Sequence, residues 1–135
     1  MTQTTEPTAG DQSRFQVVEI KGQFSTLNDH DKLNRHNRYI GAEHKKNQTN
    51  MAAMQLGKMA LIEHPCVMTW HWYISTSHDP DNIAFAKKYI LDGMVKAGKL
   101  ENDNQTWILG FGGDAFIRVP KGEEKVLIEI EEYLS

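Results

Sequence analysis

The chain has 135 residues, of which 39% are hydrophobic, and this length suits one ordinary domain with its own core. Its single cysteine, Cys66, excludes an internal disulfide and a redox CxxC pair, and it fits a reducing compartment. A formal net charge of −3 argues against simple binding to nucleic acid. However, seven lysines and arginines against four acids lie between Lys21 and His64, so positive charge is concentrated in the first half.

The first 14 residues are polar and lack the apolar stretch of a secretory signal. Nowhere in the chain do 18 apolar residues follow one another, as a membrane-spanning helix requires. We therefore expect a flexible N-terminal tail over residues 1–14, a single domain over residues 15–135, no membrane partner and a cytoplasmic location.

The first half predicts a strand, a long loop and a helix. Residues 15–21 are rich in apolar side chains and are closed by Gly22, which indicates a strand. Residues 22–38 contain many Asn, Asp, His and Ser and show little periodicity, which indicates a long loop. Residues 39–62 contain no proline and space their apolar side chains as a helix does, so we expect the first main helix there.

The clearest strand signal lies over residues 67–76. Met68, Trp70, Trp72 and Ile74 alternate with polar or smaller side chains, which is the period of a strand with one buried face. The pattern predicts that these four side chains lie on the buried face.

The second main helix is predicted over residues 83–97, where apolar side chains recur at helical spacing and Gly98 follows. A Gly-Gly pair at positions 112 and 113 is expected to separate two short strands, and a third strand ends the chain. These strands are predicted over residues 107–111, 116–119 and 125–132. Together the elements predict a two-layer α+β domain, with both helices on one face of a mixed sheet.

Four carboxylates and a lysine form the most informative cluster. Asp79 and Asp81 are separated by a proline, which cannot continue a strand, so Asp79 is expected at a strand end and Asp81 at a helix start. Spacing puts Asp81, Lys88 and Asp92 along one helix face. Asp103 reaches the same cleft only if the chain doubles back after the helix.

Carboxylates held close together repel unless a cation neutralises them, and hard oxygen ligands suit Mg²⁺, with Mn²⁺ as the alternative ion. Such an ion activates water for attack on a phosphate, and a nearby lysine stabilises the developing charge. The cluster therefore predicts metal-assisted phosphate chemistry without a further small-molecule cofactor. Another interpretation stays open, in which the cluster has no chemical role. The acids at the helix start are then caps, Lys88 and Asp92 are an ordinary pair one helical turn apart, and Asp103 lies in a solvated turn.

The chain resembles the RusA family, the Holliday-junction resolvases carried by phages and prophages. Residues 79–83 (Asp-Pro-Asp-Asn-Ile), 88–98 (Lys-Tyr-Ile-Leu-Asp-Gly-Met-Val-Lys-Ala-Gly) and 102–103 (Asn-Asp) are similar to its D-x-D-N, K-x-x-x-D and terminal D signature. Residues 27–28 (Leu-Asn) and 37–46 are similar to the loop and helix start of phage members, and the resemblance covers nearly the whole chain.

The resemblance implies a homodimeric, Mg²⁺-dependent endonuclease that makes paired cuts in four-way DNA junctions. It would serve recombination, repair or phage DNA processing in a bacterial host or a phage-infected cell. The motif match implies Asp79, Asp81 and Asp103 as metal carboxylates and Lys88 as the catalytic lysine, with Lys87 as the alternative lysine. Asp92 would be a further metal ligand. Candidates for contacting the DNA backbone are Asn28, Lys32, Arg35, Arg38, Lys45 and Lys46.

Two departures from the family pattern concern DNA binding and the outer carboxylates. Some members carry arginines before the first aspartate, where this chain has Ser-Thr-Ser-His over residues 75–78, and Asn102 stands where others have an acid. Two rival functions therefore stay open: a broader flap or fork endonuclease, and a non-catalytic junction-binding protein. Stacking of Trp70 and Trp72 on unpaired bases is a weaker interpretation than a place in the core or a dimer interface.

Overall fold

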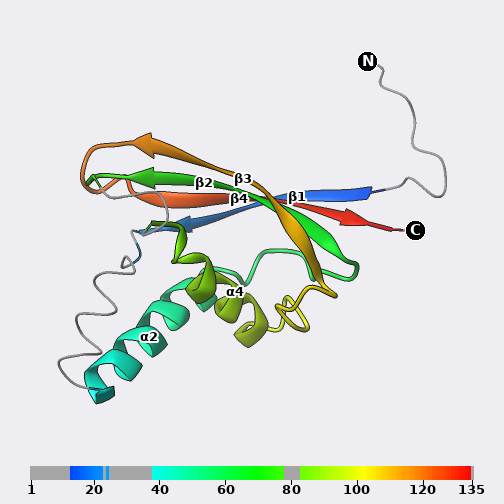
Figure 1. The fold of residues 1–135 in the computed structure, drawn as a ribbon, viewed down its shortest axis with the longest axis horizontal. Coiled ribbons are helices and arrows are strands. Elements are labelled where there is room, and N and C mark those ends of the chain that lie inside the picture. Colours follow the sequence, from blue (N-terminus) through cyan, green and yellow to red (C-terminus); the bar gives the residue numbers. More distant parts are fainter. Residues whose placement is uncertain (1–12, 23, 25–37, 78–82, 135) are drawn as a thin grey trace.

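The computed structural model describes residues 13–22, 24, 38–77 and 83–134, and this part of the chain forms an α+β domain (Figure 1). Two helices lie on one face of a four-stranded mixed sheet, which confirms the predicted architecture. The strands are β1 (Ser13–Lys21), β2 (Cys66–Ile74), β3 (Ile108–Arg118) and β4 (Lys125–Tyr133), and the helices are α2 (Arg38–Ala53) and α4 (Lys87–Lys96).

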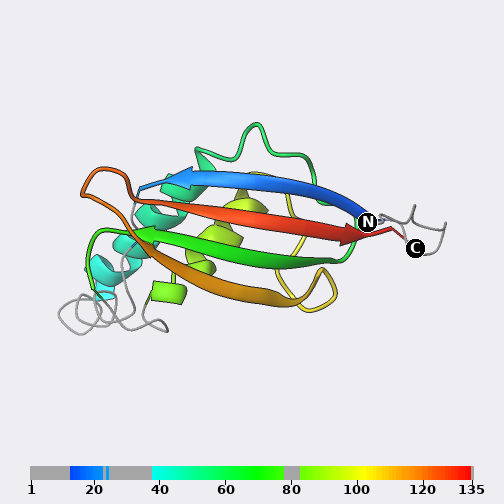
Figure 2. The same ribbon diagram turned by 90° about the horizontal axis from the view of Figure 1, so that it is seen from above.

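The sheet has the strand order β1-β4-β2-β3, so β1 and β3 are its two edges (Figure 2). β4 pairs antiparallel with both β1 and β2, whereas β2 and β3 run parallel. Parallel neighbours need a crossover connection, and α4 provides it between β2 and β3. The carboxyl ends of β2 and β3 therefore lie at the same end of the sheet, and their amino ends lie at the other.

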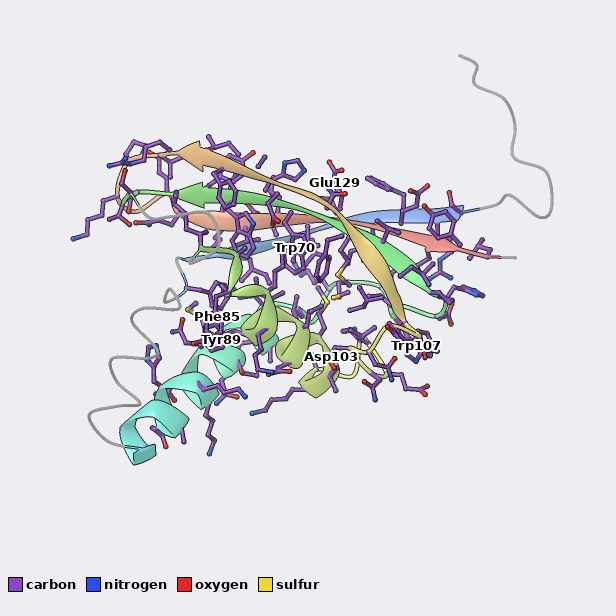
Figure 3. All side chains as sticks on the ribbon, in the orientation of Figure 1. Trp70, Phe85, Tyr89, Asp103, Trp107 and Glu129 are labelled. Atoms are coloured by element: carbon purple, nitrogen blue, oxygen red, sulfur yellow. The ribbon has the colours of Figure 1, made fainter. Side chains whose placement is uncertain are left out.

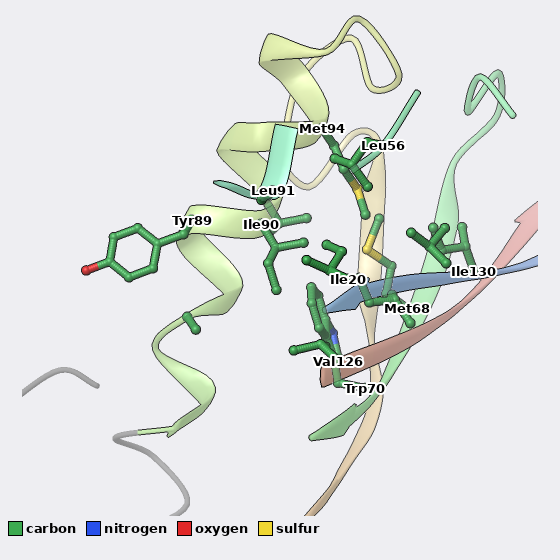
Figure 4. Close-up of a cluster of buried hydrophobic side chains, with 14 of the residues drawn as sticks. Ile20, Leu56, Met68, Trp70, Tyr89, Ile90, Leu91, Met94, Val126 and Ile130 are labelled. Carbon is green, nitrogen blue, oxygen red and sulfur yellow. The ribbon is translucent and has the colours of Figure 1, made fainter. Parts of the chain in front are cut away.

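The core lies between the sheet and the two helices (Figure 4). Alternation along the strands directs every second side chain towards the helices, as predicted for β2. The strand residues buried in this way include Ile20, Met68, Trp70, Trp72, Val126, Ile128 and Ile130. α4 contributes Ile90 and Met94 from the opposite side, and both are fully buried. Burial of each such side chain contributes roughly 1.5–3 kcal/mol to folding.

The two helices pack closely because α4 contains a glycine where they meet. A Cβ atom added to Gly93 would lie 2.9 Å from the Cβ of Ala52 and 3.1 Å from the backbone nitrogen of Ala53. Any larger residue at position 93 would push α4 away from α2. This glycine lies inside the segment that carries the K-x-x-x-D pattern, and here it has a packing role.

The first helix is shorter than the predicted 39–62, because α2 ends at Ala53. The next turn tightens, since the N–H groups of Gln55 and Leu56 bond to carbonyls three residues earlier. The Gln55 side chain then pairs with the backbone of Lys21, accepting from its N–H at 2.7 Å and donating to its carbonyl at 2.9 Å. Because the chain leaves the helix at Ala53, the Gln55 side chain can attach the segment after α2 to β1. Leu56 and Ile62 of that segment remain buried.

The predicted break at Gly112 and Gly113 is wrong, because β3 runs unbroken through both glycines. The β2–β3 register shifts between Met68 and Thr69, and Gly112 is the extra residue at this bulge. A side chain on Gly112 would collide with the Thr69 hydroxyl. The glycines therefore allow close approach to β2 instead of forming a turn.

The other element boundaries differ from the predictions by a few residues. β1 begins at Ser13, so Arg14 belongs to the sheet and not to the tail, whose first 12 residues lie outside the described chain. α4 begins at Lys87 and not at residue 83, while its end before Gly98 agrees with the prediction. No helix in the described ranges is long and apolar enough to cross a membrane.

Candidate functional site

The carboxyl ends of β2 and β3 are tied together by polar contacts just before the acidic segment. Arg118 donates from Nε to the Ser75 carbonyl at 3.0 Å and from Nη1 to the Ser77 hydroxyl at 3.2 Å. The Ser75 hydroxyl donates to the Glu124 carboxylate at 2.6 Å, and this bond is the main cause that lowers the pKa of Glu124. The chain is therefore held in place up to Ser77, two residues before Asp79.

Lys87, the first residue of α4, points towards the edge of the sheet. Its Nζ lies 2.8 Å from Oδ2 of Asp114 in β3, and the indole N–H of Trp72 donates to Oδ1 of the same carboxylate at 2.8 Å. The Lys87 and Asp114 side chains are only 15% and 24% exposed. Nζ also lies 4.3 Å from the centre of the Phe111 ring, a cation–π contact. Both oxygens of Asp114 are thus engaged, and Lys87 is fixed at the start of α4.

Lys88 differs from Lys87 in its surroundings. It is exposed on α4, and it forms no ion pair with any residue of the described ranges. Asp92 lies one helical turn further along α4 and is half-buried. Of the two lysines considered, Lys88 is therefore the one whose amine is available to an external phosphate.

Asp103 lies at the other end of the domain. Figure 3 shows it past the carboxyl end of α4, near Trp107. Asp103 precedes the amino end of β3 at Ile108, whereas Lys87 contacts β3 at Asp114, six residues further along the strand, or roughly 20 Å at about 3.3 Å per residue. After α4 the chain enters β3 without doubling back. The structure therefore does not bring Asp103 near Lys87 or Lys88.

Several predicted site residues lie outside the described residues, namely Asp79, Asp81, Asn28, Lys32 and Arg35. Arg38 begins α2, and its side chain is also outside the description. The remaining candidates on α2 are Lys45, which is half-buried, and Lys46, which is exposed. Across the described ranges, which omit Asp79 and Asp81, no three His, Cys, Asp or Glu side chains are grouped so that they could hold a metal ion.

The donor chemistry of the acidic segment suits Mg²⁺, although its geometry is outside the description. Mg²⁺ is usually bound through one or two carboxylates while it keeps several waters and binds substrate phosphates. Asp79 and Asp81 supply two carboxylates in one short segment that follows β2. Asp114 lies opposite Trp70, midway along β2, and both of its oxygens are already engaged by Lys87 and Trp72.

Charge is divided between the two layers of the domain. The helices carry six basic residues against the two acids Glu43 and Asp92, whereas β1 and β4 together carry three basic residues against four acids. The basic residues of the helices are Arg38, Lys45, Lys46, Lys87, Lys88 and Lys96. On the opposite face of the sheet His71 lies 3.3 Å from Glu129 (labelled in Figure 3). The helical layer is therefore the better surface for a polyanion despite the net charge of −3.

Sequence reasoning missed Asp114 as a part of this region. The two glycines before it indicated a turn, so an aspartate directly after them had no predicted partner. The available signal was an acid within an otherwise apolar and glycine-rich segment. Its pairing with Lys87 depends on the bulge that carries β3 past Gly112.

Comparison of this chain with models of protein families and with curated proteins gives no match. The functional assignment below therefore depends on the residues and their placement.

Proposed function

We propose that this chain is a Mg²⁺-dependent endonuclease that cuts four-way DNA junctions as a homodimer in the cytoplasm of a bacterial host or a phage-infected cell. The observation that carries the proposal is the D-x-D-N segment, which lies in the sequence between β2 and the two lysines that begin α4. The positive helical layer supports a DNA partner. The order and spacing of the family motifs support the junction as the substrate class.

Asp79 and Asp81 are the proposed metal ligands in this site. Bound Mg²⁺ supplies an activated water and neutralises charge on the phosphate. The chain itself supplies the exposed Lys88 for the phosphate oxygens, and the Lys87–Asp114 pair fixes the start of the helix that carries Lys88. Lys45 and Lys46 of α2, and Arg38 with the loop residues before it, are the proposed backbone contacts.

Asp103 belongs to the proposed ligand set by motif match only. Asp103 precedes the amino end of β3, whereas Ser77, two residues before Asp79, is held at the carboxyl end of β3 by Arg118, which argues against one shared ion within a single chain. Asp92 is half-buried on α4 and remains a further candidate.

The placement of Asp103 also favours a second candidate function, a junction-binding protein without catalysis. In that case the acids are helix caps and solvated turns, and no metal dependence is expected. A broader branched-DNA endonuclease is the third possibility, because residues 75–77 lack the arginines of some family members and Arg118 is already bonded to Ser75 and Ser77.

The test is cleavage of a labelled synthetic four-way junction beside matched flap and linear duplexes, with Mg²⁺ and with EDTA. Paired, symmetric cuts in the junction alone and only with Mg²⁺ are expected. Cuts in every branched substrate would assign the broader endonuclease. Binding without cleavage by a folded protein in Mg²⁺ would refute catalysis and favour the binding protein.

The two adjacent lysines should give opposite results when each is replaced by methionine. Lys88→Met is expected to reduce junction cleavage by about 100-fold at unchanged stability, because it removes a charge that contacts the phosphate. Lys87→Met should lower the free energy of unfolding by about 1 kcal/mol, because Asp114 loses a partner in a partly buried site.

Cleavage rates under single-turnover conditions and urea unfolding of both variants measure the difference. A stable Lys87→Met protein that has lost cleavage, beside a fully active Lys88→Met protein, would assign the phosphate contact to Lys87 instead.

A further inference from the structure

The sheet has one face that no helix or loop of the described ranges covers. Both helices pack against the other face, and in Figure 2 they lie behind the four strands. The segment after α2 reaches β1 through Arg14 and Gln16, which lie on the same side of β1 as the buried Val18. This segment therefore attaches on the helical side. We call the uncovered side of the sheet the open face.

The open face carries exposed apolar side chains at the end where β1 begins. Phe15 is 62% exposed, Val17 is 53% exposed, and Tyr133 of β4 is 40% exposed. Val67 of β2 lies in the same row as Phe15, because both residues pair with Glu131 and directly paired side chains lie on one face. Large apolar side chains that are exposed together are typical of a contact surface.

Two carboxylates lie in the middle of this apolar surface. Glu131 lies between Phe15 of β1 and Val67 of β2, and the next row has Glu129 at the same place on β4. Both glutamates are half-buried, and the side chain of Glu129 is 42% exposed. Any segment that covers the apolar side chains must therefore also lie on these two charges.

Within the described ranges, neither carboxylate is neutralised by a lysine or an arginine. Glu129 lies 3.3 Å from His71, and Glu131 accepts a hydrogen bond from the Tyr133 hydroxyl at 3.3 Å. The negative charge of Glu131 raises the pKa of this hydroxyl. The lysines of the open face lie at its other end. The end where β1 begins is thus both apolar and negatively charged.

This charge selects among the possible occupants of the surface. DNA and anionic lipids would meet two carboxylates of their own sign, and like charges brought together oppose binding. A second copy of this chain, applied through the same face, would bring the glutamates of both copies together. Residues 1–12 carry two acids and no lysine or arginine, so this segment does not complement the surface either.

We propose that this end of the open face binds a cationic amphipathic segment of another protein. Its apolar side chains would cover Phe15 and Val17, and its lysines or arginines would pair with Glu129 and Glu131. The surface lies on the side of the sheet away from the helical layer, so a bound segment leaves the proposed DNA contacts free. The inference goes beyond the nuclease proposal and does not depend on it.

The first test is fluorescence anisotropy with a labelled synthetic helix of leucine and lysine. The peptide has its leucines on one side and about 14 residues, or roughly 21 Å. A control peptide carries glutamate in place of lysine. Wild type should bind the lysine peptide saturably and the glutamate peptide at least about 100-fold more weakly. No binding of the lysine peptide, or equal binding of both peptides, would overturn the proposal.

Single substitutions locate the binding site. Phe15→Ser should weaken binding of the lysine peptide by about tenfold and Glu131→Gln by about fivefold. The matched controls are Met54→Ser, at an apolar side chain that is 84% exposed after α2, and Glu43→Gln on α2. Both controls should bind as wild type does, and all four exposed or half-buried positions should tolerate the change without unfolding. Equal weakening in the controls and in the open-face variants would overturn the proposal.

Vesicles of neutral phosphatidylcholine distinguish a lipid surface from a protein partner. The protein should not sediment with them, because the two carboxylates would have to enter the lipid interface without a partner. Sedimentation with the vesicles that is lost in Phe15→Ser would assign the open face to lipid and overturn the proposal.

Discussion

Asp81→Asn is expected to reduce junction cleavage by at least about 100-fold, because a lost metal ligand removes several kcal/mol of transition-state stabilisation. Junction binding should be retained or become tighter, since the change removes one negative charge near the phosphates. Cleavage under single-turnover conditions and gel-shift binding, measured on the same labelled junction, separate the two effects.

The matched control is Glu101→Gln, which removes the same charge from an exposed loop residue outside the motif. It should leave both cleavage and binding unchanged. Asp103→Asn belongs in the same series, because a ligand of the same ion would reproduce the loss seen with Asp81→Asn. Loss of binding together with cleavage, in folded Asp81→Asn protein, would contradict a metal-ligand role for Asp81.

Local alternation predicted the sheet better than it predicted where elements end. The pattern through Trp70 and Trp72 located β2 because a strand with one buried face must repeat every two residues. The end of α2 depends on Gln55, which leaves the helix to bond with β1, 34 residues earlier in the chain. Such a distant partner is not visible in helical spacing. Likewise, a glycine pair gives the same local signal for a turn and for a bulge.

In the candidate site, too, the sequence predicted contacts within one element but not contacts between elements. Spacing placed Lys88 and Asp92 on one helix, and α4 contains both. Spacing did not reveal that Lys87 pairs with Asp114, because that contact crosses from the helix to an edge strand. The parallel pairing of β2 and β3 decides that Asp103 lies at the far end of the sheet, and nothing near Asp103 in the sequence indicates this.

The proposed homodimer suits the symmetry of the proposed substrate. A four-way junction is itself two-fold symmetric, and a symmetric dimer presents equal sites to opposing strands.

Trp70→Ala should lower the free energy of unfolding by roughly 3–5 kcal/mol, a large part of the stability of a small domain. Trp70 is fully buried, its ring stacks on Trp72 at 5.5 Å between centroids, and the Phe111 ring meets its edge at 5.8 Å. A cavity at this place would also remove support from Lys87, whose amine lies 5.7 Å from the Trp70 ring. Urea unfolding measures the shift in midpoint.

Two further variants show whether packing or base stacking explains Trp70. Trp70→Phe keeps much of the ring stack. It also removes the indole N–H, which is buried without a partner among the described residues. The decrease in the free energy of unfolding should therefore be far smaller than for Trp70→Ala. Trp107→Ala, at a half-buried position on the rim of the core, should also cost much less. If Trp70→Ala protein unfolded at the wild-type midpoint but bound junctions more weakly, the ring would have to contact DNA. Its burial beneath α4 argues for the core instead.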